Sequence, residues 1–200
     1  MPTEEVFANW TTQIETTTPS GGHFNVENLY DPSASRLWRL YLDAFKLLPV
    51  NKRLWVISAG LGLVRGEDPA PTLGYSATFT TQSPDFVEHP REWWNLLTKW
   101  HPRSFAHERA IHDLYSQLQD GHSLIIACGG SYYDAISDDL SQIRLNDGRR
   151  LVLAGTEVAI ACVPPHLQKC AIAFPYHTPK VTASGQVAMQ LVERFVQEKA

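Results

Sequence analysis

Residues 124–133 read Leu124-Ile125-Ile126-Ala127-Cys128-Gly129-Gly130-Ser131-Tyr132-Tyr133. The first five residues are all apolar, which predicts a strand buried on both faces. The glycine pair ends that strand, and apolar residues at helical spacing then predict a helix over 131–143. A buried strand that leads directly into a helix is the repeating unit of α/β folds.

The rest of the chain continues this alternation of helices and strands. Capping residues and apolar spacing predict helices at 31–48 and 90–100, a helix capped by Ser104, and a last helix capped by Ser184. Short apolar runs predict strands at 53–58, 150–154, 157–163 and 170–174. We therefore expect an α/β fold in a single domain, with a mainly parallel or mixed central sheet flanked by helices. The closely spaced strands between 150 and 174 could add an antiparallel edge or hairpin.

Two segments lack such patterns. Residues 1–27 are weakly patterned and include a loop-like run of Thr, Ser and Gly, so we interpret them as an N-terminal extension or linker. The α/β domain would then span 28–200. Residues 64–90 are rich in proline and have no periodic pattern, which predicts a long loop, and loops of that length are usually functional or disordered.

The composition excludes several classes of protein. Of 200 residues, 44% are hydrophobic and 19% charged, and the formal net charge is −4. These values predict a globular chain and argue against a broad basic face for nucleic-acid backbone, although a local groove stays open. No apolar run reaches the roughly 18 residues of a membrane span, and the N-terminus has no signal region, so we expect no membrane partner. Three cysteines without a CxxC pair indicate a reducing, cytoplasmic compartment.

Two predicted strand ends and the loop between them are the candidate ligand sites. Ligands of open α/β sheets bind outside the carboxyl ends of the strands, where glycine lets a ligand approach the backbone. The candidate ligand-binding residues are Ser58, Gly60, Leu61 and Gly62, then Tyr75, Ser76 and Thr78, and then Gly129, Gly130, Ser131 and Tyr132. Both strand ends can equally be ordinary turns, and the loop can simply cover the core.

Other reactive or aromatic groups have two interpretations each. Cys128 is either a nucleophile activated by a helix N-terminus or a buried, inert thiol. The cluster of Trp93, Trp94 and Trp100 beside the basic segment 101–109 is either a single-strand nucleic-acid platform or part of the core. No spacing of His, Cys or acidic residues fits a metal site, so we expect no metal.

Two ordered motifs resemble the peroxide stress protein YaaA family and related uncharacterised bacterial YaaA-like domains. They are Leu54–Val64 with Pro71 and Gly74–Phe79, and Leu124–Tyr133, preceded by Asn28-Leu29-Tyr30-Asp31. The resemblance implies a cytoplasmic α/β protein linked to oxidative stress and DNA protection, with DNA binding, and related domains serve nucleic-acid modification and phage defence. The chain departs from YaaA itself in being shorter and acidic and in lacking a basic helix-hairpin-helix segment and an opening strand.

Three hypotheses follow for the function. The first is a YaaA-like protein of nucleic-acid stress response or phage defence that recognises a nucleotide, base or DNA element. The second is an enzyme acting on a nucleobase or nucleoside, such as a glycosidic-bond hydrolase or transferase, for which Glu67, Asp68 and Glu108 are the nearest acidic candidates. The third is a non-enzymatic subunit that binds a protein partner or a second copy of the chain. The residues identify neither a cofactor nor a catalytic set.

Overall fold

The computed structural model of the chain describes residues 3–18, 24–30, 33, 35–49, 51–71, 77–81, 83, 85–175 and 183–197. Three parallel strands form the main sheet in the order β3-β4-β5. β3 spans Ser123–Ala127, β4 spans Arg150–Thr156 and β5 spans Ala171–Phe174. Each pair of neighbouring strands is parallel, and helical segments connect them, as parallel pairing requires.

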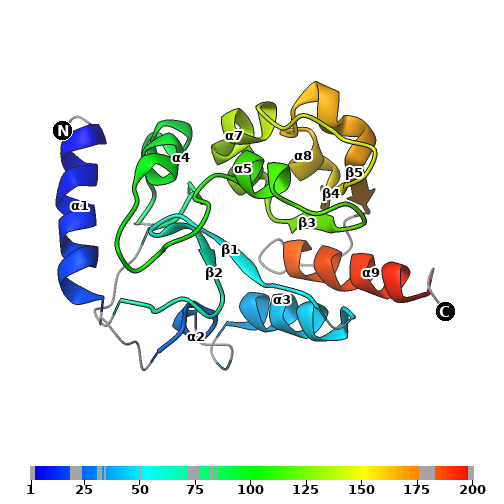
Figure 1. Cartoon of the computed structure of the whole chain (residues 1–200), viewed down its shortest axis with the longest axis horizontal. Helices are drawn as coiled ribbons and strands as arrows, with labels where there is room; N and C mark the ends of the chain where they lie inside the picture. Colours follow the sequence, from blue (N-terminus) through cyan, green and yellow to red (C-terminus); the bar gives the residue numbers. More distant parts are fainter. Residues whose placement is uncertain are drawn as a thin grey trace.

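Helices cover both faces of this sheet (Figure 1). On one face, α9 (Ala183–Gln197) packs Val187 and Leu191 against Val152 and Phe174 of the sheet, and α3 (Arg36–Leu47) packs against α9. On the other face, Leu153 joins the main core together with α6 (Gly130–Ala135), α7 (Ser137–Ser141) and α8 (Glu157–Ile160). The chain is a single-domain α/β fold with a parallel main sheet, as the sequence predicts.

Two predicted elements in this half of the chain are corrected by the structure. Residues 157–163 were expected to form a strand, but they form α8 and the turn after it. The cause is local, since the Thr156 hydroxyl caps the helix by accepting a hydrogen bond from the Ala159 amide at 3.3 Å. β5 then follows a short 3₁₀ helix (Pro165–Cys170) and runs parallel to β4, so residues 150–174 contain no antiparallel edge. The predicted helix 131–143 is two short helices, α6 and α7, that meet at Ile136.

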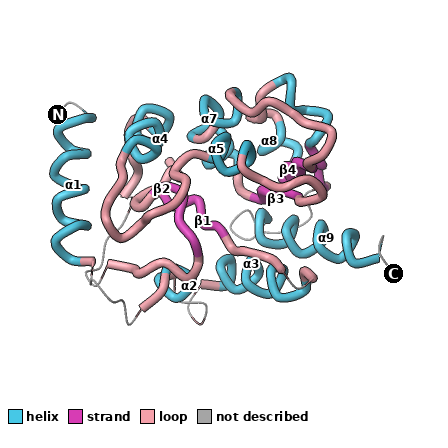
Figure 2. The backbone as a smooth tube through the Cα atoms, viewed as in Figure 1, coloured by secondary structure: helices cyan, strands magenta, loops and turns pink. Residues whose placement is uncertain are grey.

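An antiparallel pair of strands lies outside the main sheet. β1 (Trp55–Ser58) matches a predicted strand, whereas β2 (Gly62–Arg65) extends into the segment that was expected to be a loop. The chain from β2 to α4 (Pro90–Lys99) is otherwise irregular where it is described (Figure 2). α5 (Ile111–Ser116) begins after Ala110 rather than at Ser104.

The N-terminal segment is built into the main core. α1 (Thr3–Thr17) lies within residues 1–27, which the sequence suggested were an extension or linker, and it packs against α4. The Phe7 ring meets Trp93 edge-on with centroids 5.1 Å apart, and Ile14 is buried. A short helix, α2 (Val26–Leu29), follows. No helix in the described part of the chain has the length and apolar character needed to cross a membrane.

The tryptophan cluster belongs to the core. Trp93, Trp94 and Trp100 are 4%, 0% and 9% exposed. Rings this buried offer no face to an unpaired base, so the core interpretation of the cluster is confirmed and the nucleic-acid platform is wrong.

Gly155 in β4 should not tolerate even one added methyl group. A Cβ there would lie 2.9 Å from the Cβ of Ala159 and 3.3 Å from Cδ1 of Ile160, so Gly155→Ala must displace α8 from the sheet. We expect the free energy of unfolding in urea to fall by about 1–3 kcal/mol, as in other overpacked cores. The control is Gly129→Ala beyond the end of the neighbouring strand, where a Cβ meets nothing within 4 Å. Equal stability of the two variants would contradict this account.

Candidate functional site

The first predicted ligand segment, Ser58–Gly62, is a buried hairpin turn between β1 and β2. The Ser58 hydroxyl oxygen accepts hydrogen bonds from the amides of Gly60 at 3.3 Å and Leu61 at 3.1 Å. The same oxygen accepts a hydrogen bond from the Tyr30 hydroxyl at 2.9 Å. Ser58 is 1% exposed and Leu61 is 0% exposed, so the turn is closed by its own polar groups.

Side chains from other elements donate hydrogen bonds to carbonyl groups of this turn and of the strand that follows it. Trp93 Nε1 donates to the Ala59 carbonyl at 2.7 Å, and Trp10 Nε1 donates to the Gly60 carbonyl at 2.8 Å. The Arg109 guanidinium donates to the carbonyls of Leu61 and Leu63. The turn is therefore held as a packing element beneath α1 and α4, and a ligand-binding role for Ser58, Gly60, Leu61 and Gly62 stays a prediction.

Arg109 also explains the glycine at position 62. Gly62 has φ of +78°, and a Cβ there would lie 2.8 Å from a guanidinium nitrogen of Arg109. Burial lowers the pKa of Arg109 from its ordinary value to about 10, and the nearby Asp68 carboxylate opposes that shift. Gly62 is thus required by backbone conformation and by the approach of a buried cation, without any ligand.

The third predicted segment, Gly129–Tyr132, lies at the carboxyl end of β3. Gly129, rather than Ser131, is the N-cap residue of α6, and Ser131 lies half-buried in its first turn. A Cβ at Gly129 would meet nothing, whereas one at Gly130 would touch the Ala159 backbone at 3.5 Å. Gly129 is therefore the position of this segment with open space beside its backbone.

Tyr132 lies among groups from separate segments. The Thr78 side chain is close enough to lower the pKa of Tyr132, and the Tyr132 ring meets Phe79 edge-on with centroids 5.1 Å apart. Tyr30, which bonds Ser58, lies close enough to Tyr132 to raise its pKa, and Tyr41 of α3 is a charge neighbour of Tyr132 as well. We call this set the hydroxyl cluster: Tyr30, Tyr41, Ser58, Thr78 and Tyr132. All except Ser58 are half-buried. One residue of each predicted segment belongs to this set (Ser58, Thr78 and Tyr132), while Tyr75 and Ser76 lie outside the described residues.

Cys128 is a buried thiol directly after β3. It is 8% exposed, and burial raises its pKa far above the ordinary value, with the nearby Cys162 as a smaller cause. A thiol that holds its proton this strongly is a poor nucleophile, so the geometry favours the inert interpretation.

The acidic residues suggested by the sequence have structural partners or lie exposed. Asp68 Oδ2 accepts the Arg65 amide and contacts His107 Nε2, each at 2.6 Å, which fixes the turn after β2. Glu67 is exposed and lies 3.8 Å from Arg53. Glu108 is half-buried, and its carbonyl oxygen lies 2.9 Å from His107 Nδ1.

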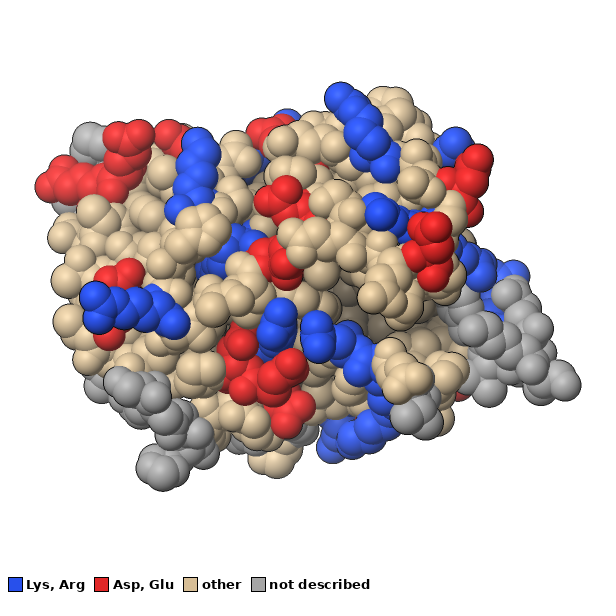
Figure 3. All heavy atoms as spheres, viewed as in Figure 1, with Lys and Arg blue, Asp and Glu red and all other residues tan. Residues whose placement is uncertain are grey.

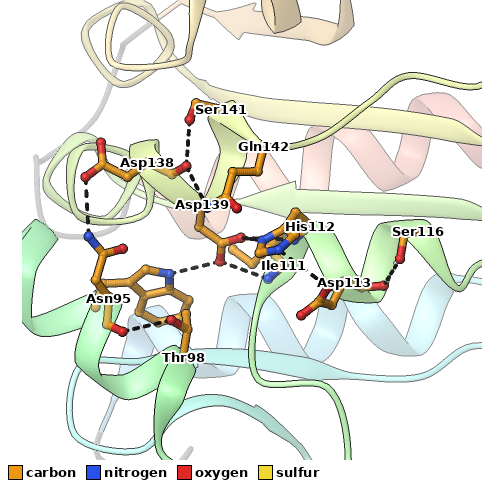
Figure 4. A network of polar contacts seen from close by, with 11 residues as sticks. Asn95, Thr98, Ile111, His112, Asp113, Ser116, Asp138, Asp139, Ser141 and Gln142 are labelled. Atoms are coloured by element: carbon orange, nitrogen blue, oxygen red, sulfur yellow. Dashed lines mark hydrogen bonds and ion pairs between the residues drawn. The ribbon is translucent and has the colours of Figure 1, made fainter.

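A second polar site, which sequence reasoning missed, centres on Asp139 of α7. Asp139 is 1% exposed, and its Oδ2 accepts hydrogen bonds from Trp94 Nε1 at 3.0 Å and the Ile111 amide at 2.8 Å. Its Oδ1 accepts the His112 amide at 3.0 Å and lies 2.6 Å from His112 Nδ1 (Figure 4). A buried carboxylate therefore joins α4, α5 and α7 and orients one imidazole.

His112 faces an open cleft of about 420 Å³. The cleft is polar, and its lining side chains are Asn95, Thr98, Lys99, Ala110, His112, Asp113, Asp138 and Gln142. A sequence signal for this site existed, because Asp139 interrupts the apolar face formed by Ile136, Leu140 and Ile143. Its partner His112 could be found only in space.

Comparison with protein-family models, with curated proteins and with solved structures finds no match. The described part of the chain contains no group of three or more His, Cys, Asp or Glu side chains placed to hold a metal ion.

We expect the free energy of unfolding to fall at alkaline pH, in part because of the Tyr132 phenol. Burial, helped by the neighbouring Tyr30, raises its pKa from 10.0 to about 12 in the folded chain. Below pH 10 both states keep the phenol proton; between pH 10 and about 12 the unfolded state loses it first, so stability falls as pH rises. In urea unfolding from pH 8 to 11.5, the free energy of unfolding should fall less steeply for Tyr132→Phe than for the unmodified chain. The difference between the two slopes should be at most about 1.4 kcal/mol per pH unit, the largest contribution of one titrating group. Identical slopes in the two proteins would show that Tyr132 titrates normally.

Proposed function

We propose that the chain recognises a nucleotide, a nucleobase or an unpaired base of DNA at the hydroxyl cluster. In this proposal it serves as a YaaA-like cytoplasmic protein in a bacterial nucleic-acid stress response or in phage defence. The observation that carries the proposal is the set of hydroxyl groups from separate segments around Tyr132, whose amide donates to the Gly129 carbonyl at 3.1 Å.

The chemistry of the cluster suits the edge of a base. Hydroxyl groups both donate and accept hydrogen bonds, so Tyr30, Thr78 and Tyr132 can match the mixed donors and acceptors of a heterocycle. Tyr132 follows the carboxyl end of the parallel strand β3, where ligands of α/β sheets bind. The cluster itself contains no charged side chain, which favours a neutral ring over a bare anion.

The surface charge favours a compact ligand over a long duplex. Lys and Arg side chains lie next to Asp and Glu side chains across the face shown in Figure 3, and the net charge is −4. Affinity for duplex DNA grows with the number of phosphates that cations neutralise, so a mixed surface contributes little. We therefore expect bases, nucleotides and single strands to bind better than duplex DNA.

A protein partner or a second copy of the chain is the alternative that the sequence left open. Among the described residues, the exposed large apolar side chains are Val6, Phe24, Leu47 and Val158. They come from widely separated positions on α1, the segment before α2, α3 and α8. No specific observation therefore raises this alternative above base recognition.

Calorimetric titration with free bases, nucleotides, single-stranded and duplex DNA at two salt concentrations tests the proposal. We expect saturable binding of at least one base-containing ligand, and a loss of tenfold or more in Gly129→Glu, because the added carboxylate enters the open space at Gly129, in the same helical turn as Tyr132. Ser123→Glu at the opposite end of β3 adds the same charge to an exposed position and should bind normally.

Absence of saturable binding to every ligand, or equal binding by Gly129→Glu and Ser123→Glu, would exclude base recognition at this edge of the sheet.

A further inference from the structure

The cleft beside His112 is chemically distinct from the hydroxyl cluster. Its lining provides two carboxylates, two amides, a hydroxyl, an ammonium and an imidazole, with Ala110 as its one apolar residue. Its volume of about 420 Å³ falls within the range of about 300–1,000 Å³ that small-molecule sites occupy.

The tautomer of His112 follows from its partner. An ionised carboxylate only accepts hydrogen bonds, so the nitrogen 2.6 Å from Asp139 Oδ1, Nδ1, carries the hydrogen. In the neutral ring Nε2 then holds a lone pair. The buried Asp139 fixes this orientation, because its two oxygens also accept hydrogen bonds from Trp94 and from the amides at the start of α5.

Two hydrogen-bond acceptor atoms, one on His112 and one on Asp113, lie next to each other at the cleft. His112 Nε2 is 3.4 Å from Asp113 Oδ1, and with the imidazole neutral neither atom supplies a hydrogen. The His112 side chain is 28% exposed and that of Asp113 is 55% exposed, so both are accessible from solvent. A ligand hydroxyl that donates its one hydrogen to Nε2 would satisfy the lone pair of that atom.

The remaining lining selects a neutral ligand with several hydroxyls. Asp138 accepts and already takes one hydrogen bond from the Asn95 amide, Lys99 donates, and the Gln142 amide does both, so a ligand group that donates and accepts can bond any of them. A phosphate would meet two carboxylates against one ammonium, and a flat apolar ring would find no aromatic face in this lining. Hydroxyl groups on adjacent carbons fit this mixture.

We propose that the cleft binds a neutral polyhydroxylated ligand, either a free sugar or the ribose of a nucleoside, with one hydroxyl donating to His112 Nε2. Asp139 acts as a positioning residue that holds the imidazole. The site is independent of the hydroxyl cluster, and it supplies the positioned histidine that an enzyme acting on nucleosides would need.

Titration with D-ribose and with adenosine, followed by calorimetry and by the ¹⁵N shift of His112 Nε2, tests this inference. We expect saturable binding with a change in the Nε2 shift, and a loss of affinity of at least tenfold in His112→Gln and in Asp113→Asn. Asp113→Asn is the safer variant for folding, because that side chain is exposed. The control variants His122→Gln and Asp147→Asn change exposed residues away from the cleft lining and should bind normally.

The outcomes separate the two sources of the sugar and the two proposed sites. Binding of both probes indicates a free sugar, and binding of adenosine alone indicates a nucleoside; either supports the inference when Asp113→Asn abolishes it. Adenosine binding that Gly129→Glu abolishes and Asp113→Asn leaves intact would place the ligand at the hydroxyl cluster and overturn this inference. Failure of both probes to bind would overturn it too, whatever the result at the hydroxyl cluster.

Discussion

The arrangement of the helices around the cleft depends on one buried carboxylate. Removing Asp139 from water is costly unless its oxygens are fully hydrogen-bonded, and the structure provides hydrogen-bonding partners on α4 and at the start of α5. The requirement fixes where these helices meet α7 more narrowly than apolar packing alone would. His112 is oriented by the same group, so the constraint that holds the helices together also sets the chemistry of the cleft.

Arg109 serves the antiparallel strands in a similar way. Its guanidinium is 1% exposed and donates to backbone carbonyls of the Ser58–Gly62 turn and of Leu63, and to that of Trp100 at 3.1 Å. The carbonyls of Leu61 and Trp100 lie outside the strands, where no ladder pairs them, and that of Leu63 lies in β2. A few buried charges thus replace regular hydrogen bonding outside the main sheet, although charged residues are only 19% of the chain.

The sequence predicted a helix or strand correctly where a single signal, such as an apolar run or a helix-starting proline, fitted only one kind of element. Apolar runs located β3 and β5, and Pro90 located the start of α4. The segment 157–163 was mistaken for a strand because a short apolar run fits a buried strand and a buried helical turn equally well, and the Thr156 cap decided between them. Neither site could be read fully from the sequence. The hydroxyl cluster adds Tyr30 and Tyr41 to predicted residues, and the cleft joins His112 to Asp139 across 27 positions.

The candidate site residues differ in how far the fold itself explains them. Ser58 and Gly62 are explained by the hairpin turn, its internal hydrogen bonds and the approach of Arg109. Any chain that keeps this turn needs similar residues, so these two positions indicate the turn before they indicate an activity. Gly129 has open space where a Cβ would lie, and the Asp113 carboxylate is exposed beside His112 within α5. Residues that the fold does not require are the ones whose chemistry can be attributed to a ligand, which is why both proposals rest on them.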